Sequence, residues 1–180
     1  MEHLLLLHGA IGSSEQLISL KEQLQAKYIV HVLDFSGHGG KQMPSTSFSI
    51  ETFANDVVMF LEENNIASTN IFGYSMGGYV AMFLAKHHPA KVSKVITLAT
   101  KFDWDSATAD KERKMLDAEK IEAKIPAFAQ TLKQRHEPNN WKDVLNRTAD
   151  MLIEMGKANP LKLEDYASIH QPCLIMLGDK

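Results

Sequence analysis

The chain has 180 residues, of which 44% are hydrophobic and 23% are charged, and its formal net charge is −3. This composition is that of a globular protein of about one domain, and it excludes disordered, collagen-like and coiled-coil classes. The small negative charge provides no basic surface for phosphates, so we expect no nucleic-acid partner and no membrane partner.

The localisation and cofactor expectations follow from what the sequence lacks. Cys173 is the single cysteine, so no intramolecular disulfide can form, which fits a reducing compartment. The apolar N-terminus has no basic region and no signal-peptide cleavage site, and no apolar run approaches the ~20 residues that span a bilayer. We therefore expect a cytoplasmic protein. No zinc-ligand spacing or P-loop is present, which predicts neither a metal nor a cofactor.

Short apolar runs alternate with longer amphipathic segments, a pattern typical of an α/β fold with a mostly parallel sheet and helices on both faces. Each run ends at turn or breaker residues and contains few polar side chains, as buried strands do. The predicted strands are residues 4–7, 28–35, 70–74, 92–99 and 172–177.

Helices are predicted between these strands. One is expected over residues 13–26 with a serine cap, a second begins after Ser49, and a third follows Ser75 and ends near residues 87–89. Residues 103–170 contain no convincing strand, and we expect them to form a helical cap inserted into a single domain over residues 1–180. The apolar stripe within this segment is expected mainly to pack on the core, with a substrate-cavity wall as the alternative.

The strongest chemical signal is the sequence Gly73-Tyr74-Ser75-Met76-Gly77-Gly78, which places G-x-S-x-G between a predicted strand and a predicted helix. A serine at such a sharp turn adopts a strained backbone, and glycines two residues away on either side remove Cβ clashes. Its hydroxyl then stands at the carboxyl edge of the sheet, beside the N–H groups of a helix N-terminus. Ser75 is therefore the candidate nucleophile.

A second signal is the loop that follows the first strand, with the sequence His8-Gly9-Ala10-Ile11-Gly12. Such a loop can present the Ala10 N–H to the same oxyanion that the Met76 N–H would bind, which makes Ala10 and Met76 the candidate oxyanion hole. The alternative is a simple strand-to-helix turn in which glycine serves only the backbone.

The chain resembles the α/β-hydrolase superfamily, in its short, cofactor-free, esterase-like branch. The matching residues are His8-Gly9 after a strand, the run from Asp34 to Gly39 after the next strand, and the segment from Gly73 to Gly78. The resemblance covers essentially the whole chain, from the family's third strand to its seventh, and it places the cap after the sixth.

The resemblance implies a Ser, acid, His triad in that chain order, with Ser75 as nucleophile. The family's acid falls three residues after Gly178, one position beyond the last residue, and its histidine lies later still. Asp103, Asp105 and Asp179 are alternative acids. No histidine is a convincing base, and only tertiary structure could bring His136 or His170 to Ser75.

We therefore predict a serine hydrolase that acts on a small-molecule ester, thioester or related acyl substrate, with a domain incomplete at its C-terminus and the triad acid and histidine missing from this chain. The last strand should then be an exposed apolar sheet edge, covered by a homodimer partner or a complementing C-terminal fragment. The alternatives are a non-catalytic ligand-binding module, or a lyase or C–C bond hydrolase of the same fold.

Overall fold

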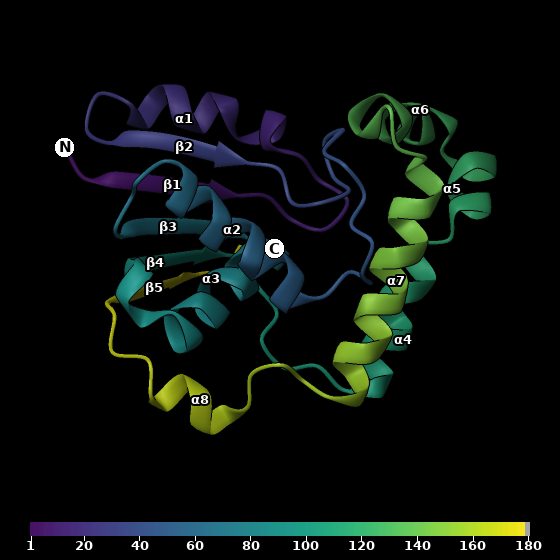
Figure 1. Ribbon diagram of the computed structural model, residues 1–180. Coiled ribbons are helices and arrows are strands. Elements are labelled where there is room, and N and C mark those ends of the chain that lie inside the picture. Colours follow the sequence, from purple (N-terminus) through teal and green to yellow (C-terminus); the bar gives the residue numbers. More distant parts are fainter. Residues whose placement is uncertain (179–180) are drawn as a thin grey trace.

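The computed structural model describes residues 1–178 and contains one parallel sheet (Figure 1). The strand order is β2-β1-β3-β4-β5, and every neighbouring pair is parallel. The expected α/β class is confirmed. The strands are β1 (His3–Leu7), β2 (Ile29–Leu33), β3 (Thr69–Tyr74), β4 (Val92–Leu98) and β5 (Cys173–Met176).

Helices cover both faces of the sheet, and strand β1 shows why. Successive side chains of a strand point to opposite faces. Leu4 and Leu6 join a cluster that includes side chains of η1 (Ser14–Leu17) and α1 (Ile18–Leu24). Leu5 and Leu7 join the main core with α2 (Ile50–Glu63) and α3 (Met76–His87). All four leucines are buried, which stabilises the layers by about 1.5–3 kcal/mol for each side chain.

The predicted helix starts are partly corrected. Ser49 caps α2 as expected, since its hydroxyl accepts a hydrogen bond from the Thr52 N–H at 3.0 Å. The single helix expected over residues 13–26 is instead a 3-10 turn, η1, followed by α1. The break falls at Leu17, whose φ of −104° and ψ of −1° depart from α-helical values.

Five helices lie between β4 and β5. The first four, α4 to α7, form a layer beyond the carboxyl ends of the strands, whereas α8 lies beside α3 (Figure 1). Buried side chains of α7 share the main core with the sheet, α2 and α3. The bounds of the remaining helices are η2 (Pro89–Lys91), α4 (Ser106–Met115), α5 (Ala118–Lys124), α6 (Pro126–His136), α7 (Trp141–Lys157) and α8 (Leu163–Ala167).

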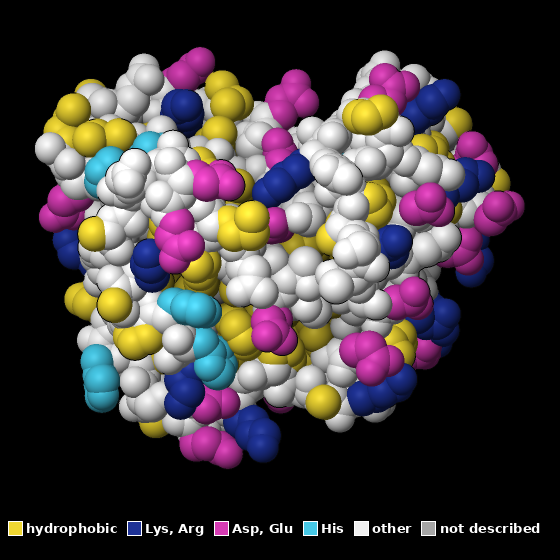
Figure 2. Space-filling model, viewed as in Figure 1, with side chains coloured by type: hydrophobic (Ala, Val, Ile, Leu, Met, Phe, Trp, Pro, Cys, Tyr) yellow, Lys and Arg dark blue, Asp and Glu magenta, His cyan; other side chains and the backbone are white. Residues whose placement is uncertain are grey.

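Strand β5 is one of the two edge strands of the described sheet, as expected, and it is exposed on both faces. Leu174 and Ile175 are 55% and 53% exposed, although both are large apolar residues. On the face viewed in Figure 2, basic and acidic side chains are interspersed over the sheet layer and the helices beyond it. Of the helices within residues 1–178, none combines the length and apolar character that crossing a bilayer requires.

Candidate active site

The backbone at Ser75 is strained, as the sequence predicts. Ser75 joins β3 to α3 with φ 50° and ψ −115°, a conformation that costs a non-glycine residue about 1–3 kcal/mol. Its N–H donates to the Leu98 carbonyl at 2.8 Å. Its own carbonyl accepts from the Thr100 hydroxyl at 2.9 Å and from the Gly78 N–H at 3.0 Å. Strand β4 and the residues after it therefore hold this turn in place.

The two glycines that flank Ser75 are required by close packing. A Cβ at Gly73 would lie 2.3 Å from the carbonyl carbon of Gly77. A Cβ at Gly77 would lie 2.5 Å from the carbonyl oxygen of Leu7 on β1. Real Cβ atoms do not approach backbone atoms so closely, so this turn can form only with glycine at both positions.

Within residues 1–178, two N–H groups near Ser75 have no hydrogen-bond acceptor. The N–H groups of Ala10 and Met76 donate to no carbonyl or side chain in the loops and turns of residues 1–178. Met76 is the first residue of α3, and the first N–H of a helix has no partner within the helix. Both residues line the same cavity as Ser75.

This cavity has a volume of about 330 Å³ and lies between the carboxyl ends of the strands and the helices beyond them. Three of the four non-glycine residues with positive φ within residues 1–178 line it, namely Ile11, Ser75 and Ala99. Strained backbone persists where the surroundings enforce it, and it concentrates at functional sites. The cavity is therefore the candidate active site.

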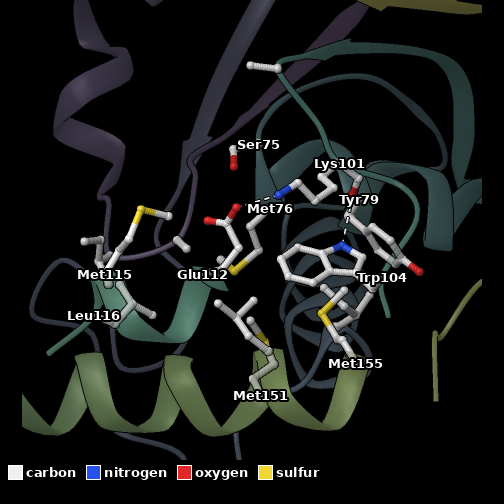
Figure 3. A pocket seen from close by; sticks show the side chains of 15 residues that line it. Ser75, Met76, Tyr79, Lys101, Trp104, Glu112, Met115, Leu116, Met151 and Met155 are labelled. Atoms are coloured by element: carbon white, nitrogen blue, oxygen red, sulfur yellow. Dashed lines mark hydrogen bonds and ion pairs between the residues drawn. The ribbon is translucent and has the colours of Figure 1, made fainter. Parts of the chain in front are cut away.

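Apolar side chains form most of the cavity wall (Figure 3). Met151 and Met155 extend from α7 toward Ser75, and both are also buried in the main core. These apolar side chains of α7 therefore both pack in the core and form part of the cavity wall. The other apolar lining side chains are Ala10, Ile11, Ile50, Met76, Tyr79, Ala99, Trp104, Met115, Leu116 and Leu152.

One ion pair lies among these apolar side chains, and no motif in the sequence predicts it. The Lys101 Nζ lies 2.5 Å from a carboxylate oxygen of Glu112 on α4, and 5.4 Å from the centre of the Trp104 ring. In Figure 3 the Ser75 side chain points toward Glu112 and Met76. Lys101 and Glu112 therefore connect the segment after β4 to α4 across the cavity.

No side chain within residues 1–178 forms a hydrogen bond with the Ser75 hydroxyl, and the expected aspartates lie elsewhere. Asp105 caps α4 by accepting from the Thr108 N–H at 2.6 Å. Asp103 lines a separate groove beside α8. Asp179 lies outside the described residues.

The buried histidines are bound to the loops rather than to Ser75. His8, on the loop after β1, lies 2.7 Å from the Gly9 carbonyl through Nδ1, and its Nε2 accepts from the Phe35 N–H. The His38 ring is tilted against the His8 ring at 5.3 Å and lies edge-on to the His136 ring at 5.7 Å, and its Nε2 has no hydrogen-bond partner within residues 1–178. Burial lowers the pKa of His8 and lowers that of His38 well below its usual value, so both rings are neutral at pH 7.

His136 and His170, whose positions the sequence leaves open, do not supply the base in residues 1–178 either. His136, at the end of α6, lies 3.1 Å from the Ile11 carbonyl. His170 is exposed, between α8 and β5. The described residues also contain no group of three or more side chains arranged to hold a metal ion.

A family model described as the alpha/beta hydrolase fold matches residues 2–162. The chain belongs to this family. The 3-oxoadipate enol-lactonase 2 of Acinetobacter baylyi is 33% identical over 92 residues, which are 51% of this chain and 34% of that enzyme. The pimeloyl-[acyl-carrier protein] methyl ester esterase of Citrobacter koseri is 32% identical over 98 residues, which are 54% of this chain and 36% of that enzyme. The match spans about a third of the length of these curated relatives.

Solved structures agree on the α/β-hydrolase fold. A thermophilic esterase from Thermogutta terrifontis superposes with a TM-score of 0.75 at 21% identity, over 99% of this chain and 71% of the esterase. At this identity the likeness concerns the fold alone.

Proposed function

We propose that this protein is a hydrolase of ester, thioester or lactone substrates, with Ser75 as the nucleophile. The observation that carries the proposal is the strained turn at Ser75 beside the free N–H groups of Ala10 and Met76, in one cavity. In this mechanism the Ser75 Oγ attacks the acyl carbonyl carbon, and the two N–H groups bind the oxyanion of the tetrahedral intermediate. Collapse of this intermediate breaks the bond to the alkoxy or thiolate group, which leaves as the alcohol or thiol with the proton that the Ser75 hydroxyl gave up (in a lactone it stays attached to the acyl chain). Water then adds to the acyl-enzyme, and its collapse releases the carboxylic acid and returns a proton to Ser75.

The cavity wall supports an apolar acyl or alkyl group on the substrate. Methionine side chains are flexible and polarisable, so a wall that contains Met76, Met115, Met151 and Met155 adapts to groups of different shape. The names of two relatives, an enol-lactonase and a methyl ester esterase, agree with acyl chemistry.

The general base and its acid are the part of the mechanism that residues 1–178 do not supply at Ser75. We propose that both lie outside this chain, so its turnover is impaired. Serine proteases that lack a triad member retain a rate about 10³–10⁴-fold above the uncatalysed rate, through the oxyanion hole and substrate binding. Slow ester cleavage, with acylation of Ser75 as its distinguishing sign, is therefore the expected activity.

The test is the cleavage of p-nitrophenyl butyrate by the chain at pH 7.5. We expect a rate about 10³-fold above that of buffer and an acyl group on Ser75, detected as a mass increase on its peptide. Ser75→Ala should lose the acyl group and part of the rate. Ser93→Ala, which removes an exposed hydroxyl at the other end of the sheet, should retain both. Equal rates for the Ser75→Ala variant and the unsubstituted chain would refute the proposal.

A non-catalytic binding module is the second candidate, because the Ser75 hydroxyl has no hydrogen-bond partner among residues 1–178. Trp104 lines the cavity and reports occupancy by its fluorescence. Saturable quenching of Trp104 by an apolar ester, without any Ser75-dependent cleavage, would favour this candidate. Fluorophosphonate labelling of Ser75, detected as a mass increase on the peptide that contains it, would favour the hydrolase.

A further inference from the structure

The C-terminal end of α6 binds the two loops that follow β1 and β2. The Arg135 guanidinium donates to the Ile11 carbonyl at 2.9 Å, and the His136 Nε2 lies 3.1 Å from the same oxygen. The Gly39 N–H donates to the His136 Nδ1 at 3.3 Å. Asn139, just after the helix, donates to the Lys41 carbonyl at 2.7 Å. Residues more than 90 positions apart are therefore joined beside the candidate oxyanion hole.

These contacts determine the protonation of the His136 ring. A backbone N–H can only donate, so the Nδ1 that faces the Gly39 N–H must be unprotonated. A neutral ring then carries its proton on Nε2, which donates it to the Ile11 carbonyl. The ring is fully buried, which favours this neutral form.

Ile11 needs such support because its own conformation is unfavourable. Its φ is 52°, in the left-handed region that β-branched residues rarely adopt. Its side chain packs against the apolar cluster that contains Leu132 of α6 and Leu145 of α7. The helical layer therefore holds both the carbonyl and the side chain of Ile11, the residue that directly follows Ala10.

We propose that Arg135 and His136 are positioning residues that hold the loop after β1 so that the Ala10 N–H faces the oxyanion site. The inference rests on the proposed function of Ala10. Without the two donors, the Ile11 peptide is free to leave its strained conformation, and the Ala10 N–H turns with it. The helices beyond the sheet then contribute to the chemistry by shaping the oxyanion hole as well as by enclosing the cavity.

Substitutions at residue 136 can separate the two contacts of the ring. The amide of glutamine reaches the position of Nε2, so His136→Gln keeps a donor for the Ile11 carbonyl. The shorter asparagine reaches the position of Nδ1, so His136→Asn keeps an acceptor for the Gly39 N–H. Arg135→Met removes the second donor to Ile11 and keeps a similar apolar stem, with Lys133→Met, on an exposed position of the same helix, as its matched control.

Amide hydrogen exchange measures the loop directly. The Gly12 N–H donates to the Gly9 carbonyl at 3.1 Å and reports the turn that contains Ala10, while the Gly39 N–H reports the Nδ1 contact. We expect His136→Asn and Arg135→Met to exchange the Gly12 N–H about tenfold faster than the unsubstituted chain. His136→Gln and Lys133→Met should leave it unchanged, and His136→Gln should instead accelerate exchange of the Gly39 N–H.

The rate of p-nitrophenyl butyrate cleavage should follow the Gly12 exchange. We expect His136→Asn and Arg135→Met to lower kcat about 10- to 100-fold with KM nearly unchanged, since displaced donors weaken transition-state binding. Unchanged Gly12 exchange and unchanged kcat in both variants would overturn the inference, as would loss of kcat in His136→Gln alone. If Ser75→Ala leaves cleavage unaltered, the proposed function fails, and the exchange of the Gly12 N–H decides by itself whether α6 positions the loop.

Discussion

Lowering the pH from about 7 to 4 is expected to destabilise the folded chain through His136. Its ring is fully buried, and burial is the largest of the effects that lower its pKa from 6.5 to about 4. The charge of Arg135 acts in the same direction, as does His8 once its ring is protonated. The Ile11 carbonyl and the Asp34 carboxylate oppose them.

The sign and size of the effect follow from proton linkage. Between pH 6.5 and 4 the unfolded chain binds a proton on His136 that the folded chain does not bind. The contribution of the neutral ring to stability is therefore complete above pH 6.5, and it decreases as the pH falls toward 4. At about 1.4 kcal/mol per pH unit, this interval corresponds to a loss of about 3 kcal/mol in the free energy of unfolding.

Urea unfolding at several pH values between about 4 and 7.5 measures this loss. In His136→Gln the ionisable ring is replaced by a neutral amide, so the decrease in unfolding free energy toward pH 4 should be smaller by about 3 kcal/mol. His170→Gln, at an exposed position, is the control and should retain the full decrease. If His136→Gln and the unsubstituted chain lose stability equally, the neutral, buried ring is not the cause.

Three further predictions concern the packing. Gly77→Ala should prevent the native turn, since its Cβ would lie 2.5 Å from the Leu7 carbonyl oxygen; near-native Ser75-dependent cleavage in this variant would contradict the geometry. Tyr79→Phe should lower the free energy of unfolding by about 1–3 kcal/mol in urea titrations, because it removes the oxygen that accepts from the buried Leu161 N–H at 3.0 Å. The exposed apolar edge at β5 should cause self-association of the chain. Sedimentation should show less self-association in Leu174→Lys than in the unsubstituted chain. An unsubstituted chain that is monomeric at all concentrations would argue against this prediction.

The strands and the turn at Ser75 could be predicted from the sequence because their causes are local. A strand buried on both faces is a short, mostly apolar run of residues. Residues 4–7 and 92–99 form such runs, so both strands could be predicted from the sequence. The strained turn needs glycine at positions 73 and 77, where a Cβ would overlap backbone atoms. The G-x-S-x-G motif therefore predicts this turn from the sequence alone.

Other features have no such local signal. The positive φ of Ile11 and Ala99 is imposed on residues that do not favour it, and glycine, the usual marker, is absent from both positions. The η1 turn replaced the start of an expected helix, although its sequence carries a serine at the cap. In these places tertiary packing overrides local preference.

Only the tertiary structure decided which distant residues meet around Ser75. Lys101 pairs with Glu112 because α4 turns back over the segment after β4, and His136 reaches Ile11 because α6 ends above the carboxyl edge of the sheet. Amphipathic periodicity predicts which face of a helix is buried, but it does not predict where in the fold that helix packs. The sequence by itself therefore determined the sheet and the turn that contains Ser75, while the packing of α4 to α7 determined the cavity and the contacts to the loop after β1.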